Sequence, residues 1–135
     1  SAASDVYKRQ IHIFTHQSVV YPFENQGEAD WMAREFFSGG MMPSHDLFEY
    51  FQDDLKIEES LRMSGTHYEK TSLALLKKME KNKSNVMEIF SHTYGSEEAK
   101  KWFQRWRIFF MSCEKLFGFK NGTEWGVSHY RFTKG

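Results

Sequence analysis

The sequence has little cysteine, no surplus of charge of either sign and no long apolar run. Its single cysteine, Cys113, cannot form an internal disulfide, which fits a reducing compartment and predicts a cytoplasmic protein. Because Cys113 lies within a helical apolar pattern, we expect a small core residue rather than a nucleophile. The 18 basic and 18 acidic residues balance, and no basic stripe is present, so nucleic acid is excluded as a main ligand.

The absence of long apolar runs excludes a second class of protein. No stretch approaches the roughly 20 residues of a membrane span, so stable membrane insertion is not expected. The apolar stretch Ile11–Phe14 is too short for the core of a signal peptide.

Several sequence signatures of cofactor and metal sites are also missing. No glycine-rich loop joins a strand to a helix, since Gly39 and Gly40 fall at a predicted helix end. His12 and His16 share one face of a predicted strand, but four residues of strand separate them by ~13 Å, too far for one metal ion. We therefore predict neither a metal site nor a dinucleotide site, and we interpret Asp53-Asp54 as a solvated loop.

The first ten residues are treated apart from the rest. Ser1–Gln10 (SAASDVYKRQ) resembles a translated transposase sequencing adapter, as found at the broken ends of environmental gene fragments. We interpret it as a non-native tail; a native disordered tail is the alternative. Residues 11–135 would then be the carboxy-terminal portion of a larger domain, because the native part opens directly on a strand.

Alternating and helical apolar patterns predict the order strand, helices, strand, helices, strand. The predicted strands are Ile11–His16, Leu55–Met63 and Trp125–Thr133, and Tyr21–Gln26 is a loop. Helices are predicted over Glu28–Phe37, from an N-cap at Ser44, from a capping box at Thr66, over Val86–Tyr94, and from a cap at Ser96 to Gly118. Three strands with so many helices make an open α/β sheet that exposes an edge and apolar surface, which points to a missing half.

Aromatic residues make up 17% of the chain, more than folding usually needs. This indicates an aromatic-lined pocket in addition to a core, although packing alone is the alternative. In the run Trp106–Phe110, the aromatic faces could bind a cation such as a sulfonium or a protonated amine. Arg107 opposes this interpretation if it points into the same space, and periodicity alone favours a buried helix.

Five stretches together carry a family resemblance: ADWMAREFFSGGMMPS, LFEYFQDDL, SGTHYEKTSLALLKKMEKN, YGSEEAKKWFQRWRIFFMSCEKLFG and NGTEWGVSHYRF. They resemble the carboxy-terminal region of S-adenosylmethionine-dependent methyltransferases of the cyclopropane-fatty-acyl-phospholipid synthase superfamily. The nearer branch is the coclaurine N-methyltransferase-like proteins. The resemblance covers Ile11–Lys134.

The resemblance implies the carboxy-terminal part of a Rossmann-like class I methyltransferase fold. The three predicted strands would be its fifth, sixth and seventh, with the last one antiparallel. The helices between Thr66 and Gly118 would form a substrate cap. The S-adenosylmethionine loop and the catalytic residues of the amine-methylating branch lie upstream, so the resemblance places no cofactor-binding residue in this chain and leaves its catalytic residues unknown.

The resemblance does assign substrate-site positions within the chain. His12 and Phe14 match positions that hold bicarbonate in cyclopropane synthases, and Tyr68 matches the tyrosine of the HY-x-x-T motif in the same pocket. An aliphatic residue is usual where Phe14 stands. Trp106 and Phe109 match aromatic substrate-pocket residues of the N-methyltransferases.

The first functional hypothesis is methyl transfer from S-adenosylmethionine to a small amine or similar nucleophile by the parent protein, with the isolated fragment inactive. Trp106 and Phe109 would wall the substrate, while His12 and Tyr68 would orient it through hydrogen bonds. The second hypothesis is cyclopropanation or methylation of a lipid substrate, an unsaturated acyl chain, with dependence on bicarbonate. The third is a non-enzymatic helical binding domain that is complete as given.

Overall fold

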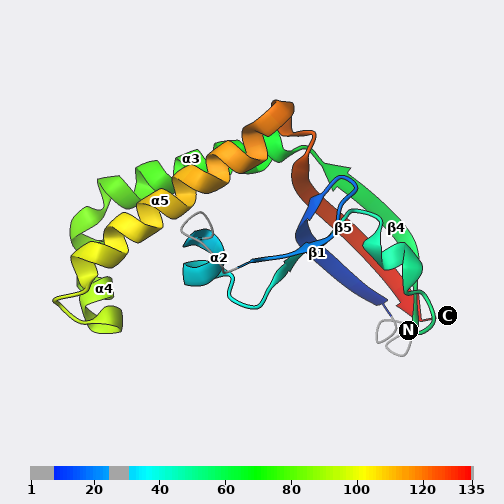
Figure 1. Cartoon of the computed structure of the whole chain (residues 1–135), viewed down its shortest axis with the longest axis horizontal. Helices are drawn as coiled ribbons and strands as arrows, with labels where there is room; N and C mark the ends of the chain where they lie inside the picture. Colours follow the sequence, from blue (N-terminus) through cyan, green and yellow to red (C-terminus); the bar gives the residue numbers. More distant parts are fainter. Residues whose placement is uncertain (1–7, 25–30, 135) are drawn as a thin grey trace.

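A small sheet and a long helical layer dominate the computed structural model, which describes residues 8–24 and 31–134. Figure 1 shows the sheet at one end, with the helical layer projecting away from it. The strands are β1 (Lys8–His16), β2 (Tyr21–Pro22), β3 (Met41–Met42), β4 (Leu55–Met63) and β5 (Trp125–Lys134). The helices are α2 (Trp31–Phe36), α3 (Gly65–Lys81), α4 (Lys83–Tyr94) and α5 (Ala99–Gly118), with 3-10 turns η2 (Leu47–Tyr50) and η3 (Phe119–Gly122).

The main sheet has the order β1-β5-β4, and β5 is antiparallel to both neighbours. The predicted three-stranded sheet with an antiparallel last strand is therefore confirmed. A bulge between Ile57 and Glu59 resets the β4 register and pairs Glu59 with Arg131. The Glu59 Oε2 atom lies 3.1 Å from the Arg131 Nη2 atom, which explains why a glutamate interrupts the apolar alternation of this strand.

The first strand begins earlier than the sequence pattern predicts. Lys8, Arg9 and Gln10 belong to β1 and pair with residues 131–133 of β5. Ladder hydrogen bonds use only backbone groups, so this pairing does not depend on which side chains the segment carries. Residues 1–7 of the predicted tail lie outside the described residues.

The helical layer is a pair of antiparallel long helices closed by a shorter one. Helices α3 and α5 run side by side away from the sheet, and α4 joins them at the far end (Figure 1). Leu76, Met79 and Phe103 are buried between them, and each such side chain contributes about 1.5–3 kcal/mol of burial free energy. The predicted helical segment between Thr66 and Gly118 is thus a separate layer with its own apolar core.

The predicted helix starts at Thr66 and Ser96 are wrong by a few residues. The N-cap of α3 is Ser64, whose Oγ atom accepts a hydrogen bond from the Thr66 backbone amide. A cap two residues earlier satisfies that amide without the capping box. Helix α5 begins at Ala99, with Glu98 rather than Ser96 at the N-cap position.

The predicted helix from Ser44 is also wrong. Ser44 lies in an isolated parallel bridge to His16, and only the short turn η2 follows. The backbone amide of His16 donates to Pro43 and that of His45 donates to His16, so this segment pairs with β1 instead of coiling. Phe51, expected on the buried side of the helix, is 69% exposed.

The segment between β1 and η2 differs from the predicted loop and helix in detail. Tyr21–Pro22 pairs with Met41–Met42 as a two-stranded ribbon, where a loop was predicted. The predicted helix over residues 28–37 is represented by α2, and residues 25–30 lie outside the described residues.

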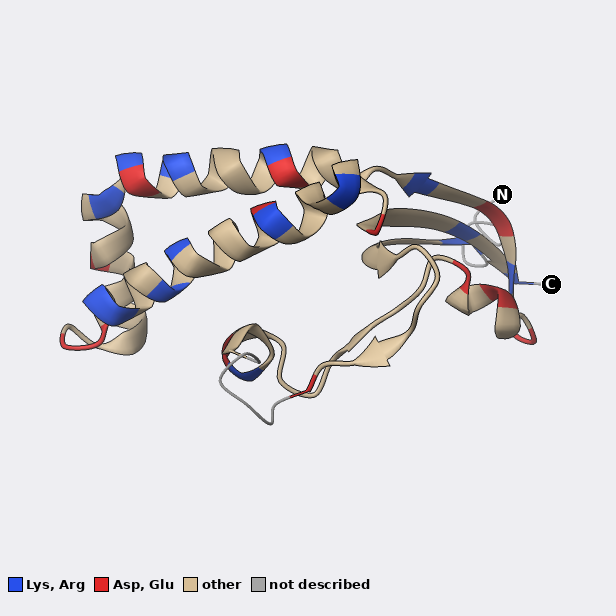
Figure 2. Ribbon diagram, turned by 45° about the horizontal axis from the view of Figure 1, so that its top comes forward, with Lys and Arg blue, Asp and Glu red and all other residues tan. Residues whose placement is uncertain are grey.

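The two long helices carry more basic than acidic residues. Helix α3 has four lysines and two glutamates, and α5 has five lysines and arginines and one glutamate (Figure 2). In the part of the chain that the structure describes, no helix is long and apolar enough to cross a membrane.

Candidate functional site

A cavity of about 510 Å³ lies between the sheet and the helices α2, α3 and α5. Half of its 16 lining residues are aromatic: Phe14, Tyr21, Phe23, Phe37, Tyr68, Phe109, Phe110 and Phe117. A volume and an apolar lining of this kind suit a small, flat organic molecule. The aromatic-lined pocket predicted from composition is therefore present.

Two of the predicted site residues line this cavity from different elements. Phe14 comes from β1, and its ring centroid lies 5.9 Å from that of Phe37. Phe109 comes from α5 and stacks on Phe36, with the ring centroids 4.4 Å apart. Alternation on the strand and the helical repeat on α5 thus bring both rings to one space.

Trp106, the third predicted aromatic, is not among the residues that line the cavity. Its Nε1 atom donates to the Tyr94 hydroxyl at 3.4 Å, and its ring contacts Phe36 and Phe109 at centroid distances of 5.0 and 5.4 Å. Trp106 belongs to the core between α3, α4 and α5 and supports Phe109 from behind.

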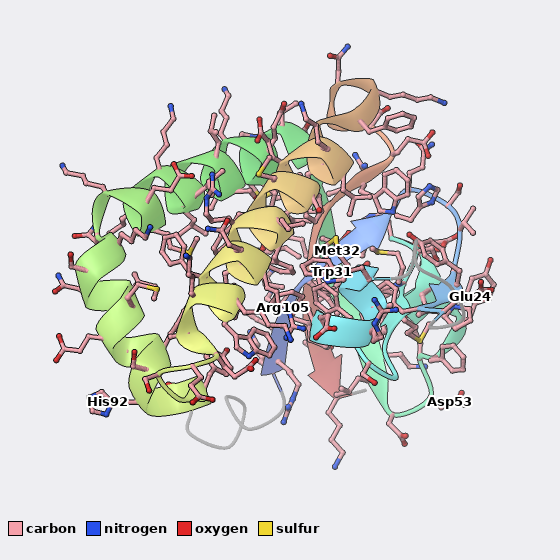
Figure 3. The ribbon with its side chains drawn as sticks, turned by 60° about the vertical axis from the view of Figure 1, so that its left-hand side comes forward. Glu24, Trp31, Met32, Asp53, His92 and Arg105 are labelled. Atoms are coloured by element: carbon pink, nitrogen blue, oxygen red, sulfur yellow. The ribbon has the colours of Figure 1, made fainter. Side chains whose placement is uncertain are left out.

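The arginines of α5 face away from the cavity. Arg105 lies 4.6 Å from the Trp102 ring centroid, and its Nη1 atom is 3.6 Å from Glu35 of α2. Figure 3 shows Arg105 beside α2, near the labelled Trp31. Arg107 Nε donates to Glu80 Oε1 at 2.8 Å, on the outer face of the helical layer. The expected conflict between Arg107 and a bound cation does not arise, because neither arginine enters the cavity.

The polar end of the cavity is formed by Tyr68 and the two histidines behind it. The Tyr68 hydroxyl and the His12 Nε2 atom are 3.0 Å apart. On its other side, His12 Nδ1 makes a hydrogen bond to His129 Nε2. The structure therefore brings together the predicted residues His12 and Tyr68 and adds His129, which the sequence reasoning missed. Their cross-strand pairing, His12 opposite His129, places the two rings on one face of the sheet.

Behind Tyr68, the two histidines open onto a second, more polar pocket of about 380 Å³. Glu59 and Arg131 also line it. His12 and His129 are both exposed in this pocket. One hydrogen-bonded row thus connects an apolar cavity with a polar one.

His16 shares the strand face of His12 but is buried and structurally occupied. Its Nδ1 atom accepts hydrogen bonds from the backbone amides of Ser18 and Val19, so Nε2 carries the proton and donates to Glu124 at 2.8 Å. This hydrogen bond, followed by one from Lys120, holds the pKa of the Glu124 carboxyl below its usual value. His16 anchors a turn to the start of β5.

The opposite face of the sheet holds a different polar network. Ser128 Oγ lies 2.6 Å from both Thr15 Oγ1 and His45 Nδ1. The Tyr130 hydroxyl donates to the His45 carbonyl oxygen at 2.5 Å, and burial raises the pKa of Tyr130. Thr15 and Ser128 are fully buried and His45 is half-buried, so the hydroxyl pair at the centre of this network is closed to solvent.

Cysteine and metal chemistry find no support in the site. Cys113 lines the cavity, and burial raises the pKa of its thiol to about 11, so it remains a thiol at neutral pH. Within residues 8–24 and 31–134, no group of three or more potential ligands is placed to hold a metal ion.

Comparison with known proteins gives a consistent set of relatives. The chain is 37% identical over 122 residues to an (S)-coclaurine N-methyltransferase of Papaver somniferum, covering 88% of this chain and 35% of the relative. It is 33% identical to a pavine N-methyltransferase of Thalictrum flavum subsp. glaucum, covering 88% of this chain and 34% of the relative. The chain therefore spans about a third of the length of these curated relatives. No protein-family model matches the chain.

Solved structures agree with the sequence relatives. A crystal structure of coclaurine N-methyltransferase bound to N-methylheliamine and SAH aligns with a TM-score of 0.82 and 32% identity, over 94% of this chain and 38% of that one. A cyclopropane synthase from Mycobacterium tuberculosis aligns with a TM-score of 0.68 at 15% identity, over 94% of this chain and 44% of that one, which supports the fold alone. The chain is a homologue of the coclaurine N-methyltransferases over most of its length and has the fold of the corresponding part of these methyltransferases.

Proposed function

We propose that the protein carrying this chain transfers a methyl group from S-adenosylmethionine to the nitrogen of a small amine. This chain would supply the substrate-facing wall. The observation that carries the proposal is the apolar, aromatic-lined cavity with a single hydrogen-bonded row at its polar end. It occurs in a homologue of N-methyltransferases, one of which has been solved with N-methylheliamine and SAH bound.

The chemistry asks for two things of the cavity. Methyl transfer from a sulfonium needs the amine lone pair in line with the methyl carbon, which an apolar, closely fitting wall enforces while excluding water. A protonated amine must also lose its proton, which requires an acceptor near the nitrogen. Phe14 and Phe109 meet the first need, and the Tyr68 hydroxyl backed by His12 meets the second.

The methyl donor itself has no evident site in the described residues. None of their strands runs through a glycine-rich loop into a helix, the unit that cradles such cofactors. We propose that other segments of a longer protein hold the donor and that this chain alone transfers no methyl group.

The role of Trp106 is revised within this proposal. The family resemblance places it in the substrate wall together with Phe109, but its ring packs against Phe109 outside the cavity lining and its indole nitrogen donates to the Tyr94 hydroxyl. Trp106 therefore fixes the position of the Phe109 wall, and Phe109 touches the substrate.

A second candidate is a cyclopropane synthase that acts on unsaturated acyl chains and uses bicarbonate. The observation in its favour is that Phe14 and Tyr68 line the same cavity and His12 bonds to Tyr68, so the three positions that the resemblance links to bicarbonate lie together. Against it, the Phe14 ring occupies the place where an aliphatic side chain is usual.

A cytoplasmic location remains a prediction.

The test uses the longer protein that contains this chain, supplied with S-adenosylmethionine carrying a labelled methyl group. We expect label in small aromatic amines and none in unsaturated phospholipids, with rates unchanged by removal of bicarbonate. Label in acyl chains, dependent on bicarbonate, would move the assignment to the second candidate. If no labelled product forms although the protein is folded, a binding domain becomes the better interpretation.

A further inference from the structure

We propose that His129 completes a proton relay that runs from the apolar cavity through Tyr68 and His12 to the polar pocket behind them. The inference rests on the proposed amine methylation and deepens it, because it names a route within this chain by which the amine can lose its proton. Neither the sequence patterns nor the family resemblance singled out His129.

The geometry supplies a continuous row of hydrogen bonds. Tyr68 lines the cavity, and its hydroxyl lies 3.0 Å from His12 Nε2. His12 Nδ1 bonds to His129 Nε2, and the two rings meet edge to face with centroids 4.1 Å apart. Each imidazole can take a proton on one nitrogen and release one from the other, which is the property that a relay needs.

The row begins in an aromatic-lined cavity and ends in a polar pocket. The cavity end is lined by aromatic rings, among them Phe117, whose ring packs edge to face against Tyr68 at 5.0 Å. The other end, at His129, is exposed in the polar pocket. A protonated amine inside the cavity has no other titratable neighbour among the lining residues except tyrosine and thiol groups.

One proton moves through the row in a balanced step. The Tyr68 oxygen accepts the proton of the ammonium and gives its own to His12 Nε2, while the Nδ1 proton of His12 passes to His129 Nε2. The amine is left neutral with a free lone pair, Tyr68 is again a phenol, and His129 carries the positive charge. His129 then releases a proton to water, and exchange at the exposed His12 ring restores its first tautomer.

The charged groups around the two imidazoles come from two strands. Glu59 of β4 and Arg131 of β5 line the polar pocket with them. These two side chains are paired with each other, and Arg131 Nε also lies 3.4 Å from Glu58. Tyr68 of α3 is the third titratable neighbour. The Glu59 carboxylate and the Arg131 guanidinium neutralise each other. The proton that His129 gains is therefore the main change in the net charge of the polar pocket.

The decisive experiment compares two substitutions in the active longer protein. His129→Gln keeps an acceptor for the His12 Nδ1 proton but cannot carry a proton itself, whereas His129→Ala removes both properties. We expect both variants to lower kcat by about 10-fold or more in weakly buffered solution, with KM changed little. Imidazole added to His129→Ala should restore much of the loss. His92→Gln, at the exposed end of α4, is the matched control and should leave kcat unchanged.

Two results would overturn the relay. One is full activity of His129→Gln, which would make His129 a purely structural hydrogen-bond partner. The other is a loss in His129→Ala that imidazole does not restore. Absence of amine methylation by the wild-type protein would instead contradict the proposed function, so the two failures are distinct.

A second readout does not depend on activity. Long-range ¹H–¹⁵N spectra of the labelled 135-residue chain report which nitrogen of each imidazole carries the proton. We expect His12 in one dominant tautomer with Nδ1 protonated, and a mixture of tautomers in His129→Ala. A tautomer population of His12 that does not change in the variant would contradict the bond on which the relay depends.

Discussion

The two faces of the sheet carry two histidine networks built from neighbouring residues of the same strands, and they differ in access. On one face, His12 and His129 are exposed and lead through Tyr68 into a cavity. On the other face, Thr15 and Ser128 are fully buried, and His45 closes the network. Successive side chains of a strand point to opposite faces of the sheet. His129 therefore faces the accessible network, and its neighbour Ser128 faces the buried one.

The closed network should dominate stability. In Ser128→Ala the hydroxyl of Thr15 and the Nδ1 atom of His45 lose their shared partner inside the protein. We expect the free energy of unfolding to fall by about 1–3 kcal/mol, measured by urea denaturation. Ser84→Ala, on an exposed helical position, should change it by less than about 0.5 kcal/mol. Equal effects of the two substitutions would remove the distinction between the networks.

His16 lies on the same face of the sheet as His12, yet it is buried and bonded to Glu124. The face of the sheet alone therefore does not decide whether a histidine is accessible. The pKa of Glu124 is lowered in the folded state, so its charge stabilises the fold above the unfolded-state pKa. This stabilisation is lost as the pH falls through the lowered pKa. We expect the melting temperatures of wild type and Glu124→Gln to differ at neutral pH and to approach each other as the pH falls below the ordinary carboxyl range. A difference that stays constant down to pH 3 would contradict this.

The open network should have the smallest effect on stability. His129→Ala removes a solvent-exposed hydrogen bond, so the free energy of unfolding should change by no more than about 0.5 kcal/mol. A loss as large as that of Ser128→Ala, in the same urea experiment, would show that the open network is structural as well.

The fold is predicted best by local patterns in which apolar residues recur with the period of a strand or a helix and so mark the buried face. Alternation located all three long strands, with Leu55–Met63 given to the residue, and the helical repeat located α5. The failed predictions depend on long-range pairing. Ser44 has the chemistry of a helix cap, but the bridge to His16 takes the backbone groups of its segment. The two-residue strands β2 and β3 carry too few residues to show a period.

The sequence predicts which residues form the site, but not the direction in which every side chain points. Phe14, Phe109 and Tyr68 line the cavity, because each is the inward member of its element's repeat. Trp106 follows the same repeat but lies toward α4, and only the packing of three helices decides that. His129 could not be found without the register of β5 against β1, which no local pattern contains.

The proposed function requires that the aromatic cavity of this chain binds the amine substrate of the longer protein. Phe109→Ala opens one wall of the cavity, whereas Ile108→Ala changes the neighbouring, exposed position of α5. The most direct measurement is the KM for an aromatic amine in the active longer protein with each substitution. We predict that KM rises about 10-fold or more in Phe109→Ala and stays within about twofold of wild type in Ile108→Ala. An unchanged KM in a folded Phe109→Ala protein would contradict the account.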